Sequence, residues 1–91
     1  MDEFEWDENK RRINLEKHYL DFFDAGYVFR GPYLRLAAKT VKGEERWLAI
    51  GKLDDVYVAI VYTPRGSVTR LISKRKARKN EQQHYDKVFS G

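Results

Sequence analysis

The length, the composition and the charge of this sequence exclude several classes of protein. Its 91 residues suffice for one compact domain. The absence of cysteine excludes disulfides, thiolate metal sites and cysteine nucleophiles, and it suits a protein of the reducing cytoplasm. No segment approaches the roughly 18 consecutive apolar residues of a membrane span, and the acidic start at Asp2, Glu3 and Glu5 is unlike an export signal. We therefore expect residues 1–91 to form a single cytoplasmic domain with a net charge of +4 and no membrane contact.

The N-terminal third predicts a short strand followed by two helices. Residues 3–6 alternate polar and apolar side chains, which favours a strand, and Asp7 is a good N-cap for a helix from Glu8 to His18. Apolar residues recur between Leu20 and Phe29, which favours a second short helix that ends at Gly31-Pro32.

The rest of the sequence predicts strands and a final helix. The pattern predicts four strands separated by short turns, over residues 33–39, 45–52, 56–63 and 67–73. Short connections favour antiparallel neighbours, and the third segment is apolar on both faces, as in a central strand. Helical spacing returns after Ser73, which suits an N-cap. The expected class is α+β, a small antiparallel sheet with two N-terminal helices and one C-terminal helix.

Positive charge is concentrated in the last third of the chain. Residues 65–91 carry 8 Lys and Arg against 2 Asp and Glu, whereas residues 1–64 carry 10 against 12. The first turn of the expected final helix is almost wholly cationic: Lys74, Arg75, Lys76, Arg78 and Lys79. Cations are unfavourable at a helix N-terminus unless an anion is bound, so this turn, with the Ser73 hydroxyl, predicts a phosphate site. A basic helix end exposed to water is the alternative.

Several side chains are candidates for phosphoryl-transfer chemistry. Arg46 and Arg70 fall in expected strands, where a rigidly held guanidinium can bind a scissile phosphate. For Arg46, a cross-strand ion pair with Glu44 or Glu45 is an equal alternative. His18 can transfer a proton to or from RNA near neutral pH, while a cation placed at a helix C-terminus is the simpler explanation. Glu45 offers a carboxylate base beside Arg46, although glutamates after a turn are usually only solvated.

Missing motifs narrow the chemistry further. The sequence has no Walker-type phosphate loop, no Gly-x-Ser-x-Gly elbow and no His or Cys spacing for zinc. RNA supplies its own nucleophile in the 2′-hydroxyl, so Arg, Lys and His side chains suffice for cleavage to a cyclic phosphate. We therefore expect no metal and no cofactor. From the residues alone, a non-catalytic nucleic-acid-binding module or a protein-interaction domain also remains open.

Several separated motifs resemble the BrnT family of toxins in order and spacing. The matching segments are Phe4-Glu5-Trp6-Asp7, Asn14, Lys17-His18, Gly43-Glu44-Glu45-Arg46-Trp47, Ile50-Gly51, Val61-Tyr62-Thr63-Pro64-Arg65-Gly66, Arg70-Leu71-Ile72-Ser73, Arg75-Lys76-Ala77, Glu81 and Tyr85. The resemblance covers nearly the whole chain. It departs from the family at Lys74, where a small residue is more usual, and at a shorter loop over residues 37–43.

The resemblance implies a fold, an activity and partners. The fold would be that of RelE-like microbial ribonucleases, and the activity an endoribonuclease that blocks translation and arrests growth. A BrnA-type antitoxin would bind the toxin, and the complex would bind operator DNA through the antitoxin. The residues implied in binding and cleavage are Lys17, His18, Glu45, Arg46, Arg70 and Arg75. With the basic segment, the expected RNA-contacting set also includes Arg65, Ser73, Lys74, Lys76, Arg78 and Lys79.

Overall fold

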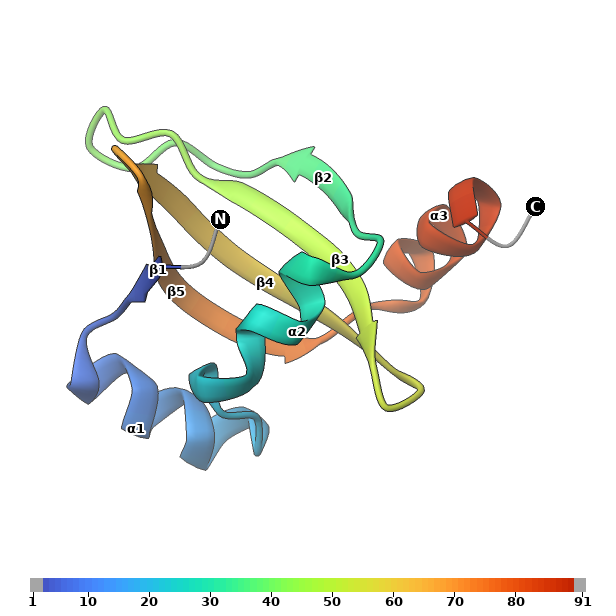
Figure 1. The fold of residues 1–91 in the computed structure, drawn as a ribbon, viewed down its shortest axis with the longest axis horizontal. Helices are drawn as coiled ribbons and strands as arrows, with labels where there is room; N and C mark the ends of the chain where they lie inside the picture. Colours follow the sequence, from blue (N-terminus) through green and yellow to red (C-terminus); the bar gives the residue numbers. More distant parts are fainter. Residues whose placement is uncertain (1–2, 90–91) are drawn as a thin grey trace.

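The computed structural model describes residues 3–89, which form a five-stranded sheet with helices against both faces (Figure 1). Within these residues no helix is long and apolar enough to cross a membrane. The elements are β1 (Glu3–Glu5), α1 (Glu8–His18), the 3-10 turn η1 (Phe22–Asp24), α2 (Ala25–Arg30), β2 (Leu34–Ala37), β3 (Trp47–Leu53), β4 (Val56–Arg65), β5 (Val68–Lys76) and α3 (Lys79–Phe89).

The first helix has the bounds that the sequence predicts. The Asp7 carboxylate accepts the backbone N–H of Asn9 at 2.8 Å, so it caps α1 as expected. The expected second helix over residues 20–29 is wrong in its form, because the chain there makes η1 and then the six-residue α2. The Asp21 carboxylate accepts the N–H of Phe23 and starts this tighter turn.

The sheet is mixed, so the prediction of a purely antiparallel sheet is wrong. Its strand order is β1-β5-β4-β3-β2, and β4 is central as predicted. Four neighbouring strands are antiparallel, but β1 pairs parallel with β5, with Glu3 beside Val68 and Glu5 beside Arg70. The rule that short connections give antiparallel neighbours does not apply to β1 and β5, because they come from opposite ends of the chain.

The start of the final helix is also wrong in the prediction. β5 continues to Lys76 and α3 begins only at Lys79, so Ser73 lies in a strand and is not an N-cap. Pairing with β4 overrides the helical spacing, since Ser73 lies opposite Val61 and Arg75 opposite Ala59. The cationic helical turn expected over residues 74–79 therefore does not exist.

A bulge in β5 determines which of its side chains share a face of the sheet. The pairing register shifts between Leu71 and Ser73, which leaves Ile72 as the extra residue. Residues directly opposite each other in a ladder share a face. The pairs on the α3 face are Thr63–Arg70, Val61–Ser73 and Ala59–Arg75. Without the bulge, Arg70 would lie on the face opposite to Ser73 and Arg75.

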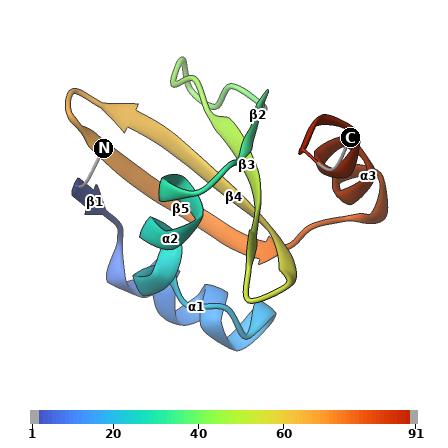
Figure 2. The ribbon, with the colours of Figure 1, turned by 45° about the vertical axis from the view of Figure 1, so that its right-hand side comes forward.

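The sheet lies between α2 and α3 (Figure 2). Apolar side chains form a cluster on each of its two faces. The larger cluster consists of Phe22, Ala25, Val28, Ala49, Val58, Ile60, Tyr62 and Leu71. The smaller cluster, under α3, consists of Ile50, Ala59, Ala77 and Tyr85. Gly51 lets α2 approach the sheet, because a Cβ there would lie 2.8 Å from Val28 Cγ1.

Candidate active site

Helix α1 lies along the edge of β5 that β1 leaves unpaired. In the described residues β1 pairs only with Val68–Arg70, so the backbone of β5 beyond Arg70 needs other partners. Asn14 supplies them, since its Nδ2 donates to the Lys74 carbonyl at 2.8 Å and its Oδ1 accepts the Lys74 N–H at 3.0 Å. This buried amide pairs with Lys74 as a neighbouring strand would, and it fixes α1 on β5.

The Lys74 side chain points into the protein and not into the solvent. It is 1% exposed, and its Nζ donates to the Asp21 carbonyl at 2.9 Å and to the Asp24 carboxylate. The placement at an exposed helix end, from which we expected Lys74 to contact phosphate, is therefore wrong. The bulge at Ile72 turns this side chain toward the segment between α1 and α2, where it joins β5 to η1.

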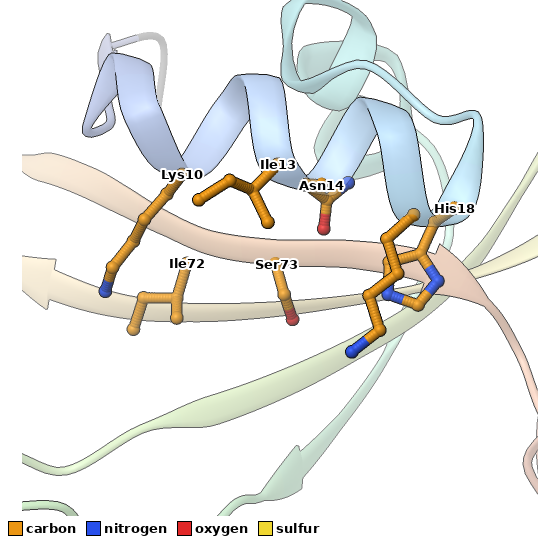
Figure 3. Close-up of a pocket in the computed structure, with 7 residues that line it drawn as sticks. Lys10, Ile13, Asn14, His18, Ile72 and Ser73 are labelled. Atoms are coloured by element: carbon orange, nitrogen blue, oxygen red, sulfur yellow. The ribbon is translucent and has the colours of Figure 1, made fainter.

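A basic groove lies between α1 and β5. One end lies between facing side chains of the two elements (Figure 3) and is lined by Lys10, Ile13, Asn14, Lys17, His18, Ile72 and Ser73. The other end is lined by Lys17, His18, Tyr19, Arg75, Lys76 and Arg78. Because Lys17 and His18 border both ends, the two hollows form one continuous surface, the α1–β5 groove.

The charge of the α1–β5 groove has one sign. Its lining contains five Lys or Arg side chains as well as His18, and none of its described lining residues is Asp or Glu. Arg75 is paired with Glu81 of α3, which is not part of the lining. The other cations raise the local concentration of phosphates and release their counterions on binding. Within residues 3–89 no group of three His, Cys, Asp or Glu side chains is close enough together to hold a metal ion.

Arg75 is held in one orientation by α3. Its Nη1 and Nη2 donate to the two carboxylate oxygens of Glu81 at 2.8 and 3.0 Å. These hydrogen bonds raise the pKa of Arg75 and lower the pKa of Glu81 below its usual range. Glu81, which is 7% exposed, also accepts the N–H of Arg78 at 2.7 Å, as the last residue of a capping box does. The contact thus couples the start of α3 to the groove.

A second group of arginines lies at the far end of β5 and is paired with carboxylates. Arg70 Nη1 lies 2.5 Å from Glu5 Oε2, and Arg65 Nη2 lies 3.1 Å from Glu44 Oε2. Arg65 also lies 3.9 Å from Glu5, and Arg46 Nε lies 3.9 Å from Glu44. The Arg46 Nε is buried without a hydrogen-bond partner in the described residues. We call these five residues the paired-arginine cluster.

The structure brings together about half of the residues expected at the site. The groove gathers Lys17, His18, Ser73, Arg75, Lys76 and Arg78. The paired-arginine cluster holds Arg46, Arg65 and Arg70, and Arg46 lies just before β3 and not within it. Glu45 lines a separate hollow with Arg46, and Lys79 is exposed at the start of α3.

Five residues of the groove were missed in the sequence: the apolar Ile13 and Ile72, and Lys10, Asn14 and Tyr19. Lys10, Asn14 and Lys17 have the spacing i, i+4 and i+7, so they share one face of a helix. That spacing is visible in the sequence and could have identified Lys10 and Asn14. Tyr19 gives no such signal, because its position depends on how α1 ends.

Comparison with known proteins identifies the family of the chain. No curated protein matches the chain. The family described as ribonuclease toxin, BrnT, of type II toxin-antitoxin systems matches residues 6–81, which include α1 and all of β5. The chain therefore belongs to the BrnT family of ribonuclease toxins, which act on RNA and are paired with an antitoxin.

Proposed function

We propose that the chain is a metal-independent endoribonuclease that cleaves RNA in the α1–β5 groove. The family supplies the ribonuclease activity. The observation that carries the location is that His18 lies in a lining of cations without a carboxylate. Such a surface attracts the RNA backbone and places the His18 imidazole, a general acid or base, beside it. The same lining repels a divalent cation, which supports a reaction that needs none.

The chemistry follows from the groups in the groove. The ribose 2′-hydroxyl attacks the adjacent phosphorus, the 5′-oxygen leaves, and the products carry a 2′,3′-cyclic phosphate and a 5′-hydroxyl. His18 exchanges the proton of one of these oxygens. Lys17, which borders the same two hollows as His18, serves the other, because Glu45 borders a different hollow. Arg75 and the Ser73 hydroxyl stabilise the charge that develops on the phosphate oxygens.

The wider biological role is part of the same proposal. A single toxin domain over residues 1–91, with a RelE-like ribonuclease fold, would cleave messenger RNA in the cytoplasm and so block translation. The antitoxin partner that the family implies would be of the BrnA type, and the toxin would reach operator DNA only through it. Two features support this proposal: the mixed sheet between helices, and the groove whose lining contains cations and no carboxylate.

The direct test compares the two histidines of the chain. Purified wild-type protein, His18→Ala and His84→Ala are incubated with total RNA in EDTA, and the new RNA ends are analysed chemically. His84 lies on α3 among Asn80, Gln83 and Lys87, away from the groove, so it is a matched control. We expect cyclic phosphate ends from wild type and His84→Ala, and at least a hundredfold slower cleavage by His18→Ala.

Three results would contradict the proposal in whole or in part. Equal cleavage by all three proteins would remove His18 from the mechanism. RNA binding without cleavage by any of them would favour a non-catalytic nucleic-acid-binding module or a toxin that needs the ribosome. Cleavage that stops in EDTA and returns with Mg²⁺ would overturn metal independence alone.

A further inference from the structure

Tyr19 is the most exposed large apolar side chain among the described residues. It directly follows α1, and 85% of its surface is open to solvent. Its backbone has the left-handed conformation, with φ 58° and ψ 27°, and its N–H donates to the Leu15 carbonyl at 2.9 Å. The base of the side chain is therefore fixed by the end of the helix, while the ring projects outward.

The fold does not explain why a tyrosine occupies this position. A left-handed residue after a helix is usually Gly or Asn, because a Cβ is unfavourable in that conformation. Other exposed rings have packing partners, since Phe23 meets Trp6 edge-on with ring centroids 5.2 Å apart and Tyr27 lies 5.4 Å from the Arg30 guanidinium carbon. In residues 3–89 no aromatic ring or cation stacks on Tyr19. Both faces of its ring are thus open to a ligand.

The neighbours of Tyr19 indicate what that ligand is. The ring borders the α1–β5 groove beside Lys17 and His18, and across the groove lie Arg75 and Lys76. An aromatic ring beside a groove of cations is the arrangement with which proteins bind single-stranded nucleic acid, because the cations hold the backbone and the ring stacks on a base. A phosphate bound near His18 would bring an adjoining base to Tyr19.

We propose that Tyr19 is a base-stacking residue of this toxin. The base of a nucleotide adjoining the scissile phosphate stacks on the Tyr19 ring, so the groove selects single-stranded RNA over duplex RNA, whose bases are already stacked. The larger π-face of a purine makes it the better occupant. This inference rests on the proposed cleavage in the groove and adds to it the form of RNA that the groove accepts.

Binding measurements with matched variants test the proposal. A short fluorescent RNA, mapped for its cleavage site and made uncleavable by a 2′-deoxy sugar there, is titrated against wild type, Tyr19→Ala, Tyr19→Phe and Tyr27→Ala. We expect Tyr19→Ala to bind about tenfold more weakly, as for the loss of one stacked base. Tyr19→Phe, which keeps the ring, and Tyr27→Ala, which removes an exposed tyrosine from α2, should bind like wild type.

Removing bases from the RNA locates the contact. An abasic nucleotide is placed in turn on either side of the cleavage site, and each RNA is titrated against wild type and Tyr19→Ala. At one position the abasic RNA should weaken binding by wild type about tenfold and binding by Tyr19→Ala hardly at all, because the base and the ring act as one pair.

The outcomes separate this inference from the proposed function. Equal losses for both proteins at every abasic position, or binding by Tyr19→Ala equal to that by Tyr27→Ala, would overturn the stacking role while leaving cleavage by His18 intact. Weaker antitoxin binding by Tyr19→Ala with unchanged RNA binding would assign the ring to the protein partner and would also overturn it. If wild type neither binds nor cleaves the unmodified RNA, both proposals are wrong.

Discussion

The α1–β5 groove and the paired-arginine cluster use the same kinds of side chain on the same strand, but they differ in their carboxylates. Arg70 and Arg75 lie on one face of β5, yet Arg70 pairs with Glu5 in a network of five charged residues, whereas the groove lining includes no carboxylate. Arg75 is the groove cation with an acidic partner, Glu81, which is a buried residue of α3. The two regions thus differ in how many of their cations lack an acidic partner: every arginine of the paired-arginine cluster has one, whereas Lys10, Lys17, Lys76 and Arg78 line the groove without an ion pair to any described residue.

The largest expected effect comes from the contact that joins α1 to β5. Asn14→Ala removes hydrogen bonds to the Lys74 backbone and leaves its N–H and carbonyl unsatisfied in the interior. We expect the free energy of unfolding to fall by about 2–4 kcal/mol, measured by urea denaturation. Cleavage should fall as well, because Lys17 and His18 are positioned by α1. Asn9→Ala is the control on the exposed side of α1, and an equal stability for both variants would show that Asn14 does not hold the groove together.

The acid stability of the protein reports on the Arg75–Glu81 pair. The folded-state pKa of Glu81 lies below its ordinary value of 4.5, so the pair stabilises the fold above about pH 4.5, and this contribution is lost as the pH falls through the folded pKa. We expect Glu81→Gln to lower the free energy of unfolding by about 1 kcal/mol at pH 7 and to lose less stability than wild type on acidification. Glu16→Gln, an exposed residue of α1, should follow the wild-type pH profile. Parallel pH profiles for all three proteins would contradict the role of the pair.

The salt dependence of RNA affinity distinguishes the α1–β5 groove from the paired-arginine cluster. Each phosphate contact contributes about 0.7 to the slope of log affinity against log salt for single-stranded nucleic acid. We expect Lys76→Ala to reduce the slope by about that amount and Arg65→Ala to leave it unchanged, since Arg65 is already paired with Glu44. Fluorescence anisotropy at several salt concentrations gives both slopes. A reduced slope for Arg65→Ala would mean that carboxylates do not remove that arginine from RNA binding.

The smallest expected effect is on stability at the end of α1. Tyr19→Gly should leave the melting temperature unchanged or raise it slightly, because Gly adopts the left-handed conformation without strain. A clear fall in melting temperature would show that Tyr19 stabilises the fold, and its unusual position would then need no ligand to explain it.

The parts of the fold that depend on local signals could be predicted, and the parts that depend on distant pairing could not. The Asp7 cap, the bounds of α1 and the central place of β4 follow from short patterns in the sequence. The helical spacing from Ala77 to Tyr85 is real, but it gives no sign that β4 extends β5 to Lys76. The parallel pairing of β1 with β5 likewise joins segments that share no local pattern.

For the candidate site too, some residues could be predicted from the sequence, whereas the partners that depend on distant pairing could not. The family resemblance identified Lys17, His18 and Arg75, which the structure brings to one groove. The burial of Lys74 could not be foreseen, because it depends on the bulge at Ile72 and on a carboxylate 50 positions away in sequence. A pattern of charges gives the sign of a surface, whereas the partner of each charge is known only from the fold.

The most direct test removes two positive charges from each region in turn. Rates of cleavage of one short RNA are compared for wild type, the double variant Lys17→Ala/Lys76→Ala in the groove, and the double variant Arg65→Ala/Arg70→Ala in the paired-arginine cluster, each checked for folding by circular dichroism. If RNA is cleaved in the groove, the first variant loses about a hundredfold or more in kcat/KM, while the second stays within about threefold of wild type. Equal losses, or the larger loss in the paired-arginine cluster, would contradict that location.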